Sequence, residues 1–333
     1  MKGAERLRTV PLVSVVIPTR NRLTLLKQAI RSVLAQQVEA LELIIVDDAS
    51  DDGTESWALQ IAHGLVHYVR LTQRSERVIA RNVGLNASTS EFVLFLDDDD
   101  MLTADSLSRL LDAIREAKTV AAVGAPEIFN ERGVYRTRPA CRLRAYMPWL
   151  DAVGGWCALQ GQALFRRRFL LDLGGFRLGT EPSEDQDLWM RVGRYPVTFI
   201  PERVVRVRSH IGQGSRESRN LTELQGRIRM NFASTLPADE VPLAQRAIAY
   251  WMEARQAQDA YYRGNGSLFR RHMVRAIAHC PVLAFSPLMR NGLMEKLGKS
   301  LIPRTLWMRL RALRATLGYG VFDEAQTRVG QQY

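Results

Sequence analysis

A run of four carboxylates, Asp97, Asp98, Asp99 and Asp100, directly follows five consecutive apolar residues, 92–96. An apolar run of this length predicts a fully buried strand. Carboxylates this close together repel one another and raise one another's pKa, so they stay ionised only where a cation or hydrogen-bond donors lie beside them. Mg2+ and Mn2+ prefer oxygen ligands and commonly join carboxylates to a substrate phosphate. The run therefore indicates a metal site for a nucleotide or nucleotide sugar.

A second interpretation of the same run needs no ligand. Residues 103–118 are predicted to form a helix, and the positive end of a helix dipole favours acidic residues just before it. The carboxylates would then belong to a solvated acidic loop that caps this helix. Taken alone, the run leaves both interpretations open.

Polar residues also follow two other apolar runs. Residues 19–22 come after the run 12–17, and residues 47–53 come after the run 41–46. In open α/β sheets, ligands bind beyond the carboxyl ends of the strands. We therefore expect these two loops to share one crevice with residues 97–100.

The segments between the apolar runs have the pattern of helices. Helices that alternate with strands at this spacing predict βαβ units, and hence an α/β fold with a parallel sheet covered on both faces. No GxGxxG follows the first strand and no GxxxxGK[ST] occurs in the chain, so dinucleotide and P-loop proteins lose their main support. The predicted helices are about 23–36, 54–63 and 77–87, with a further strand at 67–71.

Six motifs together give the chain a family resemblance. They are SVVIPTRNR (14–22), VDDASDDGT (46–54), ARNVGL (80–85), FLDDDD (95–100), GGF (174–176) and EDQDLWMR (184–191). In this order they resemble the family 2 glycosyltransferases of GT-A fold, a Rossmann-like, mostly parallel sheet with helices on both faces. The resemblance implies an inverting enzyme that uses a nucleotide sugar. The processive members carry a QxxRW motif, which this chain lacks, so transfer of a single sugar is expected.

The resemblance implies a nucleotide pocket built by several loops and one helix. Asp48 matches a carboxylate that accepts a hydrogen bond from uracil, which makes UDP the expected nucleotide, and Arg81 could bind diphosphate through two N–H groups. Alternatives remain: Asp48 could serve turn formation, and Arg81 could be a solvated helix arginine. The expected nucleotide-binding residues are Pro18, Thr19, Arg22, Asp48, Arg81, Asn82, Asp97 and Asp98.

The metal, Mn2+ or Mg2+, is assigned to the acid run by the same resemblance. Asp97 and Asp99 are the expected ligands, with Asp99 in direct contact. Asp98 is expected to face the ribose or to support the ligands, and Asp100 is expected to be structural. His210 matches a histidine that some relatives place near the metal or diphosphate; the alternative is a loop histidine without a role.

The catalytic base is expected in the motif that begins at Glu184. Ser183 and Gln186 have the spacing of a capping box, which places Glu184 and Asp185 in the first turn of a helix over 186–194. Acidic residues are stabilised there in any case. The resemblance makes Asp185 the general base and adds Glu184 to the catalytic residues, with direct displacement at the anomeric carbon and inversion.

The last third of the chain carries most of the basic charge. The net charge is +11, and residues from 215 onward hold 18 Lys and Arg against 9 Asp and Glu. We expect a catalytic domain over 1–214 and a basic, mostly helical region over 215–333, with helices at 245–263 and 267–279. Residues 302–317 combine Trp307 with four arginines and no acid. Such a helix suits an anionic membrane surface, or it docks on the catalytic domain with its arginines in water.

The cysteines and the N-terminus indicate the compartment. Cys141, Cys157 and Cys280 are widely spaced, which disfavours a disulfide framework or zinc site, and neither a signal peptide nor a transmembrane run is evident. A cytoplasmic protein is expected, at most peripheral to the inner face of the cytoplasmic membrane.

The expected partners follow from these interpretations. They are a nucleotide-sugar donor and a glycan or lipid-linked acceptor in surface polysaccharide synthesis. Nucleic acid is not expected, because no RNA-binding signature occurs. The alternative function is a catalytically inactive nucleotide-sugar-binding or scaffold protein of the same fold; the presence of Asp48, Asp99 and Asp185 favours the enzyme.

Overall fold

The computed structural model describes residues 11–38, 40–130, 133–137, 142–209, 221–286 and 288. By their contacts these residues form two compact units. The first contains the described residues of Met1–Ile128, Pro139–Pro148 and Cys157–Arg208, and the second contains those of Phe129–Arg138, Trp149–Trp156 and Ser209–Tyr333. His210, the predicted boundary at 214/215 and the basic segment 302–317 lie outside the described residues.

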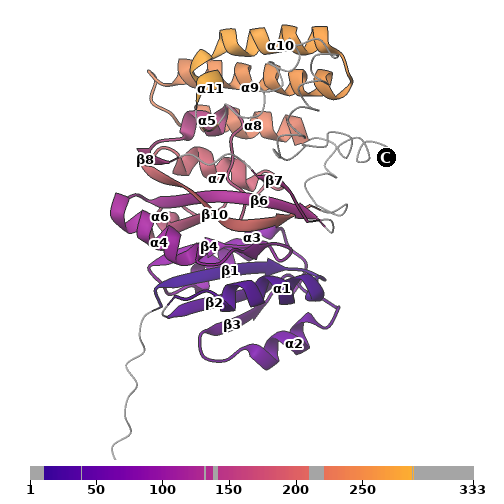
Figure 1. Ribbon diagram of the computed structural model, residues 1–333, viewed down its shortest axis with the longest axis vertical. Helices are drawn as coiled ribbons and strands as arrows, with labels where there is room; N and C mark the ends of the chain where they lie inside the picture. The colour runs from indigo at the N-terminus through magenta and orange to yellow at the C-terminus, as the bar shows by residue number, and fades with distance from the viewer. Residues whose placement is uncertain are drawn as a thin grey trace, which may run out of the picture. The chain divides into compact units, whose positions relative to one another are not determined.

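Four parallel strands form one half of the sheet in the first unit. They lie side by side in the order β3, β2, β1 and β4 (Figure 1). Each lies within one or two residues of a strand that the sequence predicts, and β2, β1 and β4 are the buried apolar runs, whereas β3 is partly exposed. Their bounds are Val66–Arg70 for β3, Leu41–Asp47 for β2, Val13–Thr19 for β1 and Phe92–Phe95 for β4.

The sheet continues from β4 through antiparallel pairs. β9 lies antiparallel to both β4 and β6, and β10 lies antiparallel to both β5 and β8. The sheet is therefore mixed, with its parallel strands at one end. The bounds are Ala163–Arg166 for β9, Ala121–Asn130 for β6, Val197–Arg208 for β10, Met101–Leu102 for β5 and Leu143–Tyr146 for β8.

Helices cover both faces of the parallel strands, as predicted. Val13, Val15 and Ile17 of β1 join the core formed with α1 and α4, whereas Val16, which points to the opposite face, lies against α3. The helices of this unit are α1 (Leu23–Leu34), α2 (Thr54–Ile61), α3 (Arg77–Ala87), α4 (Ser106–Ala117), α6 (Arg167–Asp172) and α7 (Glu184–Val192).

In the second unit, the helix predicted at 245–263 begins at Val241. In the first unit, two element starts differ from the sequence predictions by three or more residues. The helix predicted at 103–118 begins only at Ser106, because β5 pairs with β10 and Thr103 N donates to Val204 O at 3.1 Å. The strand predicted at 203–209 begins at Val197, since β10 runs on as one long strand. Both differences arise from strand pairing between distant segments, which local periodicity does not report.

Helices make up most of the described part of the second unit. α9 and α10 lie side by side (Figure 1), where Phe269 and Met273 pack on Ala257 and Ala260. No helix in the described ranges is long and apolar enough to cross a membrane. The elements are β7 (Gly133–Thr137), α5 (Trp149–Val153), α8 (Leu221–Ala233), α9 (Val241–Tyr262), α10 (Gly266–His279) and α11 (Pro281–Phe285).

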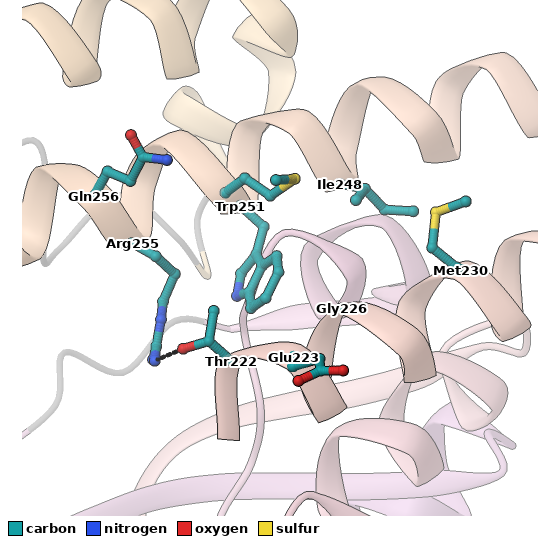
Figure 2. Close-up of a pocket in the computed structure, with 9 residues that line it drawn as sticks. Thr222, Glu223, Gly226, Met230, Ile248, Trp251, Arg255 and Gln256 are labelled. Carbon is teal, nitrogen blue, oxygen red and sulfur yellow. Dashed lines mark hydrogen bonds between the residues drawn. The ribbon is translucent and has the colours of Figure 1, made fainter. Parts of the chain in front are cut away.

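A pocket of about 610 Å³ opens between α8 and α9 (Figure 2). Its apolar wall includes the Trp251 indole, and at its polar end Arg255 Nη2 donates to Thr222 Oγ1 at 2.9 Å. The buried guanidinium of Arg229 lies 4.0 Å from the centroid of the Trp251 ring and donates to Val153 O at 2.8 Å. A cation over an indole face is a favourable packing arrangement, so these contacts stabilise the second unit.

Gly84 allows α3 to approach the sheet closely. A Cβ at this position would lie 2.2 Å from Val16 Cγ1 and 3.2 Å from Val46 Cγ2, both in buried strands. We expect Gly84→Ala to lower the free energy of unfolding by about 1–3 kcal/mol through overpacking, measured by urea denaturation. Gly226→Ala in α8 is the control, because its Cβ would meet only Trp251 Cζ3, at 3.9 Å. The control should stabilise by up to about 1 kcal/mol through helix propensity. Equal stability of the two variants would contradict this account.

Candidate active site

The acid run lies at the carboxyl end of β4 and is largely buried. Asp98, Asp99 and Asp100 are 5%, 9% and 4% exposed, and β5 separates them from the start of α4. The interpretation as a solvated loop capping that helix is therefore wrong. Buried carboxylates need charged or hydrogen-bonding partners, and these partners define the site.

The three predicted loops meet at Asp98. Thr19 Oγ1 donates to Asp98 Oδ2 at 2.8 Å, and Arg22 Nη1 donates to Asp98 Oδ1 at 3.1 Å and to Asp99 Oδ2 at 3.0 Å. Asp48 N donates to Thr19 O at 2.9 Å, which brings the loop after β2 to the same place. Burial raises the pKa of Asp98 to about 6, although Arg22 and Thr19 favour its ionised form.

Three carboxylates of the run could hold one metal ion. Asp97, Asp99 and Asp100 each offer an oxygen, and these oxygens lie within 4.8 Å of one another. An all-oxygen set fits Mg2+ or Mn2+. Asp100 was expected to be structural and is the addition to the predicted pair. Burial and the charges of Asp97 and Asp99 raise its pKa well above the usual value.

Arg208, at the end of β10, supports the acid run from the antiparallel half of the sheet. Its backbone N donates to Asp100 Oδ1 at 2.8 Å and its Nε to Asp99 O at 3.1 Å. Its Nη2 donates to Gln28 Oε1 on α1 at 2.7 Å. These contacts hold the backbone of Asp99 and the carboxylate of Asp100 in place. His210, predicted as a metal ligand, lies outside the described residues and remains a prediction.

Arg81 connects the acid run to the motif at Glu184. It is 1% exposed; its Nη2 donates to Asp97 Oδ1 at 2.8 Å and its Nη1 to Glu184 Oε1 at 2.5 Å. Although burial disfavours its charge, Asp97, Asp185 and Glu184 raise the pKa of Arg81 above its usual value. The solvated-arginine alternative is therefore wrong. The diphosphate contact remains a prediction.

Glu184 and Asp185 occupy the first turn of α7, with Ser183 at the predicted N-cap position. Glu184 is 2% exposed and is held by Arg81, whereas the Asp185 side chain is 28% exposed and lies 4.0 Å from Arg81 Nη1. Burial and the neighbouring Glu184 raise the pKa of Asp185 to about 7, against the opposing charge of Arg81. Gln160 Nε2 also donates to Asp185 Oδ1. The more accessible of the two carboxylates thus has the properties of a base near neutral pH.

Two predicted nucleotide-binding side chains engage backbone groups in the structure. Asn82 donates to Phe176 O at 2.8 Å and accepts from Phe176 N at 2.9 Å, which fixes the GGF segment. Asp48 Oδ1 accepts from Ser75 N at 2.6 Å. Pro18 is half-buried near the end of β1. The nucleotide contacts of these residues remain predictions.

Asp52 has a structural role in the loop after β2. Its carboxylate accepts from Leu23 N at 2.9 Å and from Thr54 Oγ1 at 2.6 Å. It therefore ties the starts of α1 and α2 together. This is the structural role typical of an Asp in a turn.

Several contacts of the site have no signal in the local sequence. Arg77, at the start of α3, donates through its backbone N and its Nε to the Glu181 carboxylate at 2.8 and 3.0 Å. Gln160 and Arg208 likewise contact residues far away in the sequence. Only Gly161, an isolated glycine shortly before β9, could have marked a tight turn next to Gln160.

Known proteins resemble this chain in sequence and in fold. The description Glycosyl transferase family 2 matches residues 14–174. "Uncharacterized glycosyltransferase RC0461" of Rickettsia conorii is 25% identical over 241 residues, covering 69% of this chain and 39% of that protein. "GalNAc(5)-diNAcBac-PP-undecaprenol beta-1,3-glucosyltransferase" of Campylobacter jejuni is 36% identical over 110 residues, covering 32% of this chain and 36% of that protein. The matched regions thus span about two fifths of the length of these curated relatives.

The fold has a counterpart among solved structures. S. aureus TarS 1-349 in complex with UDP-GlcNAc matches with a TM-score of 0.57 and 17% identity, over 79% of this chain and 90% of that chain. The sequence match contains the acid run, Arg81 and the loops after β1 and β2. Residues 14–174 accordingly form a glycosyl transferase family 2 region, and the chain has the GT-A fold.

Proposed function

We propose that the chain is a metal-dependent, inverting glycosyltransferase. It moves one sugar from a nucleotide sugar, UDP-linked, to a hydroxyl of a glycan or lipid-linked acceptor in surface polysaccharide synthesis. The observation that carries this proposal is the link through Arg81 between Asp97 in the acid run and the two carboxylates of α7. A candidate metal site and a candidate base are thereby held in one framework.

The names of related proteins support the two substrate classes. The TarS structure contains UDP-GlcNAc, and the Campylobacter protein is named as a glucosyltransferase for an undecaprenol-linked substrate. By analogy, we assign a UDP-sugar donor and a glycan or lipid-linked acceptor to this chain. The peripheral membrane contact predicted for 302–317 would suit a lipid-linked acceptor and is part of the proposal.

The donor half of the proposed reaction uses the acid run. Asp97, Asp99 and Asp100 would hold Mn2+ or Mg2+, which neutralises charge on the leaving diphosphate when bound. Thr19 and Arg22 fix Asp98, the carboxylate expected to face the ribose. Asp48 would accept a hydrogen bond from the uracil ring. These residues bind and orient the donor before any bond is broken.

The acceptor half uses Asp185. Its carboxylate takes the proton of the acceptor hydroxyl, and the oxygen attacks the anomeric carbon from the face opposite the diphosphate. A pKa near 7 suits this role, because the group is largely ionised at slightly alkaline pH and still basic enough to bind a proton. A single displacement inverts the anomeric centre.

The alternative is an inactive nucleotide-sugar-binding or scaffold protein. The absence of a carboxylate from the candidate site would be the strongest support for this alternative. The acid run, Glu184 and Asp185 are all present. The two functions differ in turnover, since a scaffold protein would bind a nucleotide sugar without releasing UDP. The next two experiments separate them.

We expect Asp99→Asn to weaken metal-dependent binding of UDP about 100-fold, or ~2.7 kcal/mol, because an amide is a poorer ligand than a carboxylate. Binding is measured by calorimetry in Mn2+, and EDTA should weaken binding to the wild type by a similar factor. Asp112→Asn is the control, since Asp112 is exposed on α4. Equal affinity of the wild type in Mn2+ and in EDTA would contradict a metal-bound donor.

We expect Asp185→Asn to lower kcat by about 10²–10⁴-fold, because general base catalysis contributes this much, while UDP-sugar binding is retained. Release of UDP from a panel of UDP-sugars is followed between pH 5 and 9. Since the base acts ionised and its pKa is about 7, wild-type kcat should fall as pH drops below about 7. In Asp185→Asn this dependence should disappear. Full activity of the variant would refute the assigned base, and donor binding without UDP release by the wild type would favour the scaffold alternative.

A further inference from the structure

The Asp185 carboxylate is held by one of its two oxygens. Gln160 Nε2 donates to Oδ1, and the same oxygen is the one that lies 4.0 Å from Arg81 Nη1. Within the described residues, neither contact engages Oδ2. An Asp side chain in a first helical turn can rotate about its side-chain bonds, so the contact to Gln160 determines which oxygen is directed away from the protein framework.

The turn that carries Gln160 is fastened to two strands of the sheet. Gly161 N donates to Phe95 O at 2.7 Å, which attaches the turn to the end of β4. Gln162 Nε2 donates to Gly124 O at 2.8 Å, and Gly124 N donates to Gln162 O at 2.9 Å, which attach it to β6. Gln162 Oε1 also accepts from Leu159 N at 2.7 Å and closes the turn. Gln160 therefore projects from a backbone with little freedom to move.

Gly161 makes this close approach possible. Its φ of +78° lies in the left-handed region that favours glycine. A Cβ there would lie 2.5 Å from Val205 Cγ2 and 2.9 Å from Leu96 Cδ1. The turn is thus packed directly against the strand that ends in the acid run, with no room for a side chain at 161.

We propose that Gln160 is a positioning residue that holds Asp185 Oδ1 so that Oδ2 receives the proton of the acceptor hydroxyl. This inference rests on the proposed function, in which Asp185 is the base. Gln160 is well suited to the task because its amide is neutral and donates a hydrogen bond without forming an ion pair that would abolish basicity. It acts through Asp185 and does not itself exchange the proton.

The hydrogen bond from Gln160 also affects the basicity of Asp185. A donor to the ionised form lowers the pKa of a carboxyl group, and here it opposes the increase caused by burial and by Glu184. Loss of Gln160 should therefore have two effects at once: a less well oriented carboxylate and a higher pKa. A purely structural glutamine would change stability and leave both properties unaltered.

The test compares Gln160→Leu and Gln160→Glu with the wild type. Glu has nearly the same shape as Gln, but its ionised carboxylate cannot donate, so it separates the hydrogen bond from side-chain volume. We expect kcat to fall about 10–100-fold, the acid limb of the kcat profile to move up by about one pH unit, and the KM for the donor to stay unchanged. Gln60→Leu, at an exposed position of α2, is the control and should match the wild type.

A second measurement does not depend on turnover. The carboxyl carbon of Asp185 is titrated by 13C NMR in the unliganded protein, its signal being the one absent from Asp185→Asn. The titration midpoint should be higher in both Gln160 variants than in the wild type. If the midpoints coincide, or if kcat and its pH profile are unchanged in an active enzyme, Gln160 does not position the base. If the wild type shows no turnover but the titration midpoint of Asp185 still differs in the Gln160 variants, the proposed function is refuted. The effect of the hydrogen bond from Gln160 on Asp185 then still holds.

Discussion

The buried guanidinium of Arg81 is the constraint on which the site depends. A cation with 1% exposure is tolerated only if carboxylates surround it, and these come from distant segments: Asp97 is 16 residues away in the sequence and Glu184 is 103. Because all three must meet, the start of α7 is fixed relative to the end of β4 and to α3. The same contact thus secures the fold and sets the separation between the acid run and Asp185.

The acid run is stabilised in a way that leaves it able to accept a further cation. Arg22 and Thr19 contact Asp98, and Arg81 contacts Asp97. Arg208 donates to the backbone O of Asp99 and to the carboxylate of Asp100. Even so, burial and mutual repulsion raise the pKa of Asp98 and of Asp100. Carboxylates whose ionised form is this incompletely compensated gain most from a divalent ion, which is the physical basis for the proposed metal dependence.

The sequence was informative where a signal is local, and uninformative where a contact joins distant segments. The buried strands, the α3 helix at 77–87 and the convergence of the three loops followed from apolar runs and from the rule for parallel sheets. The late start of α4 and the early start of β10 did not, because both depend on the pairing of β5 with β10. The convergence of Asp100 with Asp97 and Asp99 could not be predicted for a similar reason: four adjacent aspartates give no register, and only the backbone path after β4 shows which oxygens converge.

The two interpretations of the motif at Glu184 predict opposite shifts in the pKa of Asp185. Helix capping would lower this pKa, whereas a general base near neutral pH needs it raised. A helix N-terminus alone would lower the pKa of an acidic residue, yet the pKa of Asp185 is raised to about 7 by burial and Glu184. An acid with a raised folded-state pKa contributes stability below its unfolded pKa and loses that contribution as pH rises through about 7. At neutral pH and above, the ionised group therefore weakens the fold. A residue that served only to cap α7 would be better placed in water. Here a carboxylate that lowers the stability of the fold accepts a hydrogen bond from Gln160 at one oxygen. Such an arrangement is expected at an active site, where reactivity can require a group that lowers stability.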